Sequence, residues 1–291
     1  MFIIYFLFTV ITWFISILPF RVLYIVSDLL YFNLYYIFKY RRAVVYKNLR
    51  NSFTEKSKIE IKKIEKQFYK NLSDVIVEVI KTQNMTEKQM KKRFTFTNLN
   101  ILEALYKNNK SIIACMGHCG NWEWLGPALH LRIKHEGKAV IKPLSDKFFD
   151  KYMFKLRTKF TKNPDCLISH KHAFKIILKN RNKLTLNIFV ADQTPLKKNS
   201  KYWTKFLNQD TSFFLGPEKI AKTLDFAVVF LDIQRVNRGY YNIEIIKITD
   251  EPKKTDEYEI TQKFHNLLEK SIIKHPDNWL WSHRRWKHKK D

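Results

Sequence analysis

Residues 112–124 read IIACMGHCGNWEW, and this stretch decides the predicted fold. The apolar run Ile112 to Met116 has the length and composition of a buried strand, and it ends at Gly117-His118. Gly120-Asn121 then favours a turn, and Trp122-Glu123-Trp124 favours the start of a helix. The sequence therefore predicts a strand, a turn and a helix, with a histidine and a carboxylate five positions apart at the turn.

Apolar runs and helix signals alternate on both sides of this stretch. Such alternation is typical of a sheet of mostly parallel strands that is covered by helices on both faces. We therefore expect an α/β fold with a mostly parallel central sheet flanked by helices. The expected strands are 94–97 (an edge strand), 111–117, 138–143, one near Leu167, 184–191, 226–231 and 241–248. The expected helices are 57–81, one from 86, 100–106, 120–134, 147–160, 171–180 and 256–274.

Two of the expected helices begin with a capping box, a Ser or Thr followed three residues later by Glu or Gln. These boxes are Ser57 to Glu60 and Thr86 to Gln89. The first helix is expected to run to Lys81 and to cover the domain rather than to build a site. Its apolar face is predicted to consist of Ile59, Ile61, Ile64, Phe68, Leu72, Val75 and Val79.

Residues 1–20 carry no charged side chain. Because about 20 mostly apolar residues suffice to span a bilayer, this segment is expected to enter the membrane. A cleaved signal peptide is the alternative, although no basic segment precedes the apolar run and no small-residue cleavage site follows it. The aromatic-rich continuation to Lys39 is expected to form a second helix in or near the membrane interface. We accordingly divide the chain into membrane and interfacial helices at 1–52 and a cytoplasmic domain at 53–291.

The chain has 53 Lys and Arg residues against 27 Asp and Glu residues, a formal net charge of +26. Such a field attracts polyanions, among them nucleic acid, anionic lipid headgroups and acidic proteins. The basic cluster between Lys39 and Arg50 follows the apolar segments directly, and by the positive-inside tendency this predicts location at the inner (cytoplasmic) membrane with the catalytic domain on the cytoplasmic side. The three cysteines form no CxxC pair, and the six glycines form no phosphate-binding loop, so neither a metal nor a bound cofactor is expected.

The chemistry is expected at His118 and Glu123. In α/β sheets, reactive groups collect at the carboxyl ends of strands, where His118 is placed by this prediction. Glu123 is expected to accept a hydrogen bond from one ring nitrogen, while the other nitrogen takes a proton from a substrate hydroxyl. A purely structural histidine–glutamate pair is one alternative. Cys119 as a nucleophile near a helix start is another.

At this point the chain resembles the bacterial lipid A biosynthesis acyltransferases, within the wider membrane acyltransferases that share a His-x4-acid motif. The resemblance covers nearly the whole chain. Besides the N-terminal apolar segment, it rests on Arg41 to Leu49, Gly117 to Glu123, Lys142-Pro143 with Leu156-Arg157, Ala191 to Gln193, and Trp279 to Lys287.

The resemblance implies a glycerolipid-acyltransferase-like fold and transfer of a fatty acyl chain from acyl carrier protein to a hydroxyl of a lipid A precursor. It places the catalytic pair on His118 and Glu123. Two positions depart from the family pattern: Cys119 stands where an aromatic residue is usual, and Asp146 stands where an Asn is common. A carboxylate cannot donate a hydrogen bond as an amide does, so the second departure puts the polar detail of the acceptor pocket in doubt.

Six further residues are expected to bind substrate: Arg157, Lys142, Asp192, Gln193, Asn121 and Gly120. The cations suit a phosphate or a carboxylate, and Asp192-Gln193 ends the most apolar strand, where polar side chains fit a site better than a core. The C-terminal segment 279–290 combines tryptophans with basic residues, which suggests an interfacial or closing role. Expected partners are therefore an acidic carrier protein, an anionic glycolipid and the membrane, while the oligomeric state stays open.

Two other functions remain open at this point. The first is an acyltransferase for another envelope lipid, such as a lysophospholipid or an aminolipid. The second is a membrane-tethered nucleic-acid-binding protein, which explains the charge but not the site at His118, so no nucleic-acid partner is expected.

Overall fold

Strand β2 (Ile112–Met116) lies at the centre of a seven-stranded sheet, and all 5 of its residues are buried. A strand whose residues are all apolar is suited to this place, because helices cover both faces of a parallel sheet. The structure is a computed structural model that describes residues 2–161, 163–197 and 200–290. The predicted buried strand at this position is confirmed.

The strands of the sheet follow the order β1-β9-β8-β2-β5-β3-β4. Every neighbouring pair is parallel except the hairpin of β8 and β9, so the predicted mostly parallel α/β sheet is confirmed. The remaining strands are β1 (Phe94–Thr97), β3 (Glu136–Ile141), β4 (Leu167–Ser169), β5 (Thr185–Val190), β8 (Ala227–Asn237) and β9 (Tyr240–Thr249). A separate antiparallel pair, β6 (Trp203–Phe206) and β7 (Gln209–Ser212), was not predicted.

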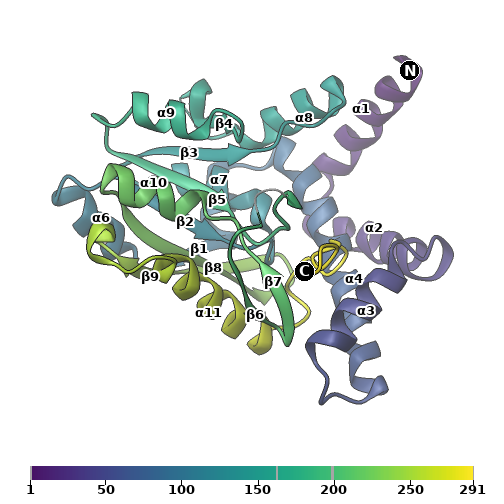
Figure 1. Cartoon of the computed structure of the whole chain (residues 1–291). Helices are drawn as coiled ribbons and strands as arrows, with labels where there is room; N and C mark the ends of the chain where they lie inside the picture. The colour runs from purple at the N-terminus through teal and green to yellow at the C-terminus, as the bar shows by residue number, and fades with distance from the viewer. Residues whose placement is uncertain (1, 162, 198–199, 291) are drawn as a thin grey trace.

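Helices cover the sheet on its two faces (Figure 1). Helix α10 contacts β2 and α11 contacts β8 and β9, whereas α7 contacts β1 and β3. These and their neighbours are α5 (Glu87–Arg93), α6 (Leu99–Lys107), α7 (Trp122–His130), α8 (Lys147–Arg157), α9 (Ala173–Lys179), α10 (Gly216–Leu224) and α11 (Glu259–Lys274). Short 3-10 turns occupy Thr82–Asn84, Pro164–Cys166 and Pro252–Lys254.

The N-terminal helices gather at one end of the sheet, the end toward which the β3 arrow points in Figure 1. They are α1 (Phe2–Ile17), α2 (Phe20–Phe32), a π-helical turn (Asn33–Ile37), α3 (Arg42–Ser52) and α4 (Lys58–Lys81). Both predicted capping boxes are present, at the starts of α4 and α5. The predicted apolar face of α4 is partly wrong, because Ile59 is 81% exposed while the polar Asn71, Asp74 and Glu78 are buried.

The apolar residues 1–20, which are expected to enter the membrane, do not form one continuous helix. Helix α1 ends at Ile17, and Pro19 starts a new helix in a different direction. Proline lacks a backbone N–H and disfavours helical backbone at the residue before it, so the apolar run is broken there. In the part of the chain that the structure describes, no helix combines the length and the apolar character needed to cross a membrane.

Polar contacts fix the broken helix to the domain. The buried Lys81 donates from Nζ to the carbonyls of Ser16 and Leu18, at 2.7 and 2.8 Å, which are groups that the end of α1 leaves free. Asp146 accepts from the backbone N–H of Phe148 and Phe149 at the start of α8 and also from the hydroxyl of Tyr5 in α1. The carboxylate at position 146 therefore caps a helix and ties it to α1.

The turn between β2 and α7 requires glycine at position 120. Gly120 has a φ of +52°, and an added Cβ would lie 3.0 Å from Ile233 Cγ2 and 3.1 Å from Tyr241 Cδ1. Left-handed backbone is costly for residues that carry a Cβ. The predicted flexible turn is therefore confirmed as a position that strongly favours glycine.

We expect Gly120→Ala to lower the free energy of unfolding by about 1–3 kcal/mol, because a strained φ is added to a close contact. The matched control is Gly126→Ala in α7, where the nearest atom to an added Cβ is the Arg157 carbonyl oxygen at 3.9 Å. This control should be neutral or stabilising by about 0.5–1 kcal/mol, since alanine favours a helix interior. Urea unfolding measures both changes, and equal effects of the two variants would contradict the strain at Gly120.

Candidate active site

His118 and Asp192 meet because β2 and β5 are adjacent and parallel. The register pairs Met116 with Val190, so the residues two positions further on leave the same edge of the sheet together. Asp192 Oδ1 accepts from His118 Nδ1 at 2.6 Å. Its Oδ2 accepts from the backbone N–H of His118 at 2.9 Å and from Trp279 Nε1 at 2.7 Å. Three donors thus hold one buried carboxylate beneath the histidine.

The carboxylate on the histidine ring is therefore Asp192, and the predicted hydrogen bond from the ring to Glu123 is wrong. Glu123, in the first turn of α7, instead accepts two hydrogen bonds from Arg157 at the end of α8, from Nε at 2.8 Å and from Nη2 at 2.7 Å. The guanidinium fork matches a carboxylate in this bidentate geometry. Glu123 still acts on His118 through its charge.

Opposing effects set the protonation of this pair. Burial lowers the pKa of His118, but the charge of Asp192, its hydrogen bond and the charge of Glu123 outweigh burial, so the pKa is raised from its ordinary value. Burial raises the pKa of Asp192, yet the charge and hydrogen bonds of His118 and the bond from Trp279 lower it to about 2. Asp192 stays ionised and accepts a hydrogen bond from Nδ1–H, so the proton stays on Nδ1 and Nε2 is the basic nitrogen.

His118 Nε2 faces Gln193, whose Nε2 lies 3.2 Å away. Because Nδ1 carries the proton, the amide of Gln193 donates to the lone pair of the histidine. Gln193 is exposed and follows Asp192 at the end of β5. A substrate hydroxyl that replaces this amide would meet the basic nitrogen directly.

An apolar cavity of about 380 Å³ begins at His118 and Gln193 and extends between α7, β3 and β5. Arg157 and Glu123 form part of its wall, and the exposed Lys142 lies at its rim beyond the end of β3. Its apolar lining consists of Met116, Leu125, Leu129, Ala139, Val140, Ile141, Leu144, Leu167, Ile188 and Val190. We call this space the acyl cavity, because its volume and its mostly apolar lining suit a hydrocarbon chain.

Gly120 and Asn121 belong to the loop between β2 and α7 (residues 117–121), which we call the catalytic loop, and neither lines the acyl cavity. Asn121 caps α7 by accepting from the backbone N–H of Trp124 at 3.1 Å, and it donates to Glu78 Oε2 at 2.8 Å. Glu78 also accepts from the hydroxyl of Tyr241 at 2.8 Å, and burial raises its pKa to about 7. The structure thus shows that these two residues, predicted to bind substrate, stabilise the conformation of the loop.

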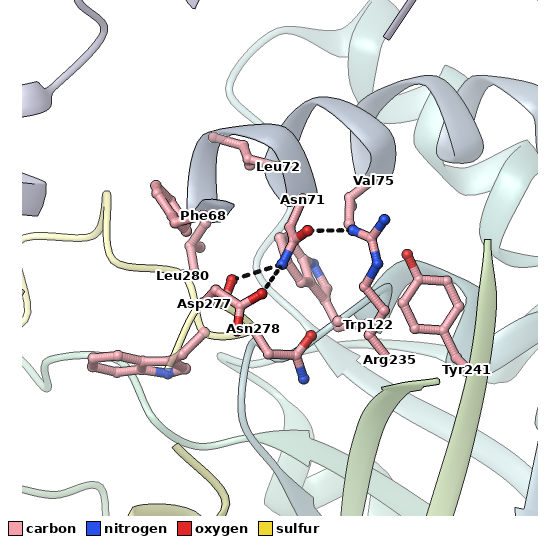
Figure 2. A pocket seen from close by; sticks show the side chains of 12 residues that line it. Phe68, Asn71, Leu72, Val75, Trp122, Arg235, Tyr241, Asp277, Asn278 and Leu280 are labelled. Carbon is pink, nitrogen blue, oxygen red and sulfur yellow. Dashed lines mark hydrogen bonds between the residues drawn. The ribbon is translucent and has the colours of Figure 1, made fainter. Parts of the chain in front are cut away.

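The C-terminal segment holds the same loop from another side. The backbone N–H of Gly120 donates to the Asn278 carbonyl at 2.9 Å, and that of Leu280 donates to the His118 carbonyl at 3.1 Å. Figure 2 shows this segment beneath α4, where Asn71 Nδ2 donates to both the carbonyl and the side chain of Asp277. The space between them, about 10 Å³, has room for about one water molecule. The C-terminal segment therefore forms a short pairing with the catalytic loop, and its closing role stays a prediction.

Cys119 does not have the properties of a nucleophile. Its side chain is buried, and burial followed by the charges of Asp192 and Asp232 raises the pKa of the thiol well above its usual range. A neutral, enclosed thiol is unreactive. Within the described ranges, no cluster of three or more His, Cys, Asp or Glu residues has the arrangement of a metal site.

A histidine base at the mouth of an apolar cavity, on a mostly parallel α/β sheet, is consistent with an enzyme that acylates a hydroxyl, and the chain is an acyltransferase. More narrowly, residues 1–288 match the family described as bacterial lipid A biosynthesis acyltransferase, and the chain belongs to that family. No curated protein matches the chain.

Asp192→Asn should reduce kcat/KM by about 10³- to 10⁴-fold, because an amide neither fixes the tautomer of His118 nor stabilises its charged form. The base acts in its neutral form, and the pKa of His118 is raised from 6.5. In the wild type, activity should therefore rise with pH through a midpoint above 6.5. Loss of the Asp192 charge removes the larger of the two charge effects that raise the pKa of His118, and burial still lowers it. The acid limb of the residual activity should therefore move to lower pH. The pH dependence of kcat/KM measures this shift. The control is Asp210→Asn on the exposed surface of β7, and an acid limb that stays in place would contradict the role of Asp192.

Proposed function

We propose that the protein transfers a fatty acyl chain from an acyl thioester to a hydroxyl of a lipid A precursor, with His118 as the general base. The observation that carries this proposal is the acyl cavity, which begins beside His118 Nε2. Membership of the family supports the lipid A precursor as the acceptor. The acyl chain fills the cavity, and its carbonyl carbon lies at the mouth.

The acceptor hydroxyl displaces the Gln193 amide and donates its proton to His118 Nε2. Its oxygen then attacks the thioester carbonyl, and the carbon–sulfur bond breaks as the tetrahedral intermediate collapses. The proton on Nε2 passes to the departing thiolate, so the histidine ends neutral. Asp192 stabilises the imidazolium that exists between the two transfers.

The oxyanion of the intermediate needs hydrogen-bond donors. The Gln193 amide, once displaced from Nε2, and the guanidinium of Arg157 on the cavity wall are side-chain donors suited to this task. Glu123 holds the Arg157 fork in place from α7, at 2.7 and 2.8 Å. In this proposal Glu123 acts as a positioning residue for Arg157 and as a charge near His118.

Two features of the protein surface, its positive charge and its exposed apolar side chains, suit an acidic carrier protein and a membrane. The net charge of +26 favours an acidic acyl carrier protein as the donor. Large apolar side chains of α1 and α2 are exposed, which supports attachment of these helices to the surface of the inner (cytoplasmic) membrane. They include Ile3, Ile4, Phe6, Leu7, Ile11, Trp13, Phe14, Ile17, Val22, Ile25, Leu29 and Phe32.

His118→Ala should lower kcat for acyl transfer by about 10²- to 10⁴-fold, since the general base is lost. The matched control is His172→Ala, an exposed histidine before α9. Transfer from acyl carrier protein to a lipid A precursor in membranes gives the rates. Wild-type turnover of the His118 variant would reject the mechanism. An unchanged acyl count in lipid A from a deletion strain, measured by mass spectrometry, would instead reject the lipid A acceptor and favour another envelope lipid.

Val140→Phe should shift the donor preference toward shorter acyl chains, because Val140 lines the acyl cavity from β3. Each CH₂ that no longer fits loses about 0.8 kcal/mol of burial, about fourfold in kcat/KM for that donor. The control is Val236→Phe, whose position on β8 is 61% exposed. Rates with a series of donors of increasing length measure the shift, and an equal loss for every length would contradict an acyl chain in this cavity.

A further inference from the structure

A second cavity, of about 360 Å³, is lined in part by Trp122 and Gln193, two residues that contact His118. It shares Trp122 and Gln193 with the acyl cavity, so these two side chains stand between the two spaces. Gln193 bonds His118 Nε2, and the Trp122 ring packs edge-on to the His118 ring at 5.4 Å between centroids. Both cavities therefore border Gln193, the residue that bonds the basic nitrogen of His118, as two substrates of one transfer require.

The lining of the second cavity is amphipathic. Leu34, Leu72, Ile76 and Leu280 supply an apolar wall, and Tyr40, Arg41, Ser282 and His283 supply a polar one. Burial lowers the pKa of His283 to about 4, so its ring is neutral at pH 7. Among the described lining residues, Arg41 alone carries a permanent charge.

The backbone around Arg41 is held in an unfavourable conformation. Lys39 and Arg41 have φ values of 48° and 50°, and left-handed backbone costs non-glycine residues about 1–3 kcal/mol each. Tyr69 donates from its hydroxyl to the Tyr40 carbonyl, and Arg41 Nη1 donates to the Ser282 carbonyl at 3.1 Å. These bonds fix the bend and hold the guanidinium at the wall of the cavity.

Arg41 and its neighbour Arg42 differ in whether an acidic side chain compensates their charge. Arg42 Nε bonds Glu65 at 3.2 Å, so its charge is compensated within the protein. Arg41 forms no ion pair with an acidic side chain in the part of the chain that the structure describes. Its guanidinium keeps donors for an external anion, and a phosphate oxygen pair fits this fork.

We propose that the second cavity binds the acceptor lipid and that Arg41 binds an anionic phosphate group of that lipid near the hydroxyl that is acylated. This inference rests on the proposed function and extends it by assigning the two cavities to the two substrates. The apolar wall receives part of a hydrocarbon chain of the acceptor. The reacting hydroxyl then lies at Gln193, opposite the acyl carbonyl.

The position of the cavity fits an acceptor that stays in a membrane. Its wall comes from the segment after α2, from α4 and from the C-terminal segment, which lie together at the end of the sheet with the N-terminal helices (Figure 1). The exposed apolar side chains of α1 and α2 belong to the same end. A lipid held beside these helices reaches Gln193, the neighbour of His118 Nε2, through the second cavity.

Arg41→Gln should raise KM for a phosphorylated lipid A precursor at least tenfold and leave hydrolysis of the acyl donor by water, without acceptor, unchanged. Arg41→Lys should recover part of the loss, because a cation is restored without the fork. With a chemically dephosphorylated precursor, wild type and Arg41→Gln should have the same KM, a result that a merely structural role of Arg41 would not give. The control is Lys47→Gln, an exposed lysine in α3 that lines neither cavity.

Ile76→Trp provides an independent variant, because it fills the second cavity from a position on α4 that is already 37% exposed. It should raise KM for the acceptor and leave donor hydrolysis unchanged, whereas Ile59→Trp, far along the same helix and 81% exposed, should change neither. An unchanged acceptor KM in both Arg41→Gln and Ile76→Trp, or a KM change for the donor instead, overturns this inference alone. A wild-type protein that acylates no lipid A precursor overturns the proposed function and this inference together.

Discussion

The hydrogen bond between Asp192 and His118 depends on the parallel register of β2 and β5, and the rest of the site depends on that bond. A parallel pair delivers both strand ends to one edge of the sheet, so a residue after one strand can support a residue after the other. An antiparallel pair would separate these ends. The contact between His118 and Asp192 is thus determined first by the order of the strands and only then by the conformation of the loops.

Buried carboxylates recur at this end of the protein, and each has several hydrogen-bond donors. Asp192 receives three, from His118 and Trp279, while Glu78 receives hydrogen bonds from Asn121, Tyr241 and Tyr24. Charged and polar groups can be buried only when such partners offset the loss of water. These hydrogen bonds hold both sides of the loop between β2 and α7 in place.

The sequence predicted what local patterns determine. The buried strand, the turn at Gly120, both capping boxes and the position of His118 after β2 are all local features. The sequence predicts Glu123 as the partner of His118, whereas the observed pairing with Asp192 depends on which strands are adjacent. Nothing local distinguishes those strands.

Three other features of the structure differ from the sequence-based predictions or are absent from them. The apolar run 1–20 has about the length of a membrane span, but Pro19 divides it between two helices. The pair β6 and β7 carries polar residues in very short strands, so its alternation is weak. The tryptophan-rich C-terminal segment is the one feature of the sequence that points to the hydrogen bond from Trp279 to Asp192. The sequence does not indicate which residue Trp279 contacts.

The pairing of the catalytic loop with residues 278–280 has a consequence for biosynthesis. The ribosome makes the chain in order, and the N-terminal helices emerge before every strand of the sheet. Trp279 and Leu280 follow all of these strands, so His118 and Asp192 gain their full set of bonds only after nearly all the chain has been synthesised. The N-terminal helices are thus made first and the bonds that hold His118 and Asp192 last, so the support of this site forms late in synthesis.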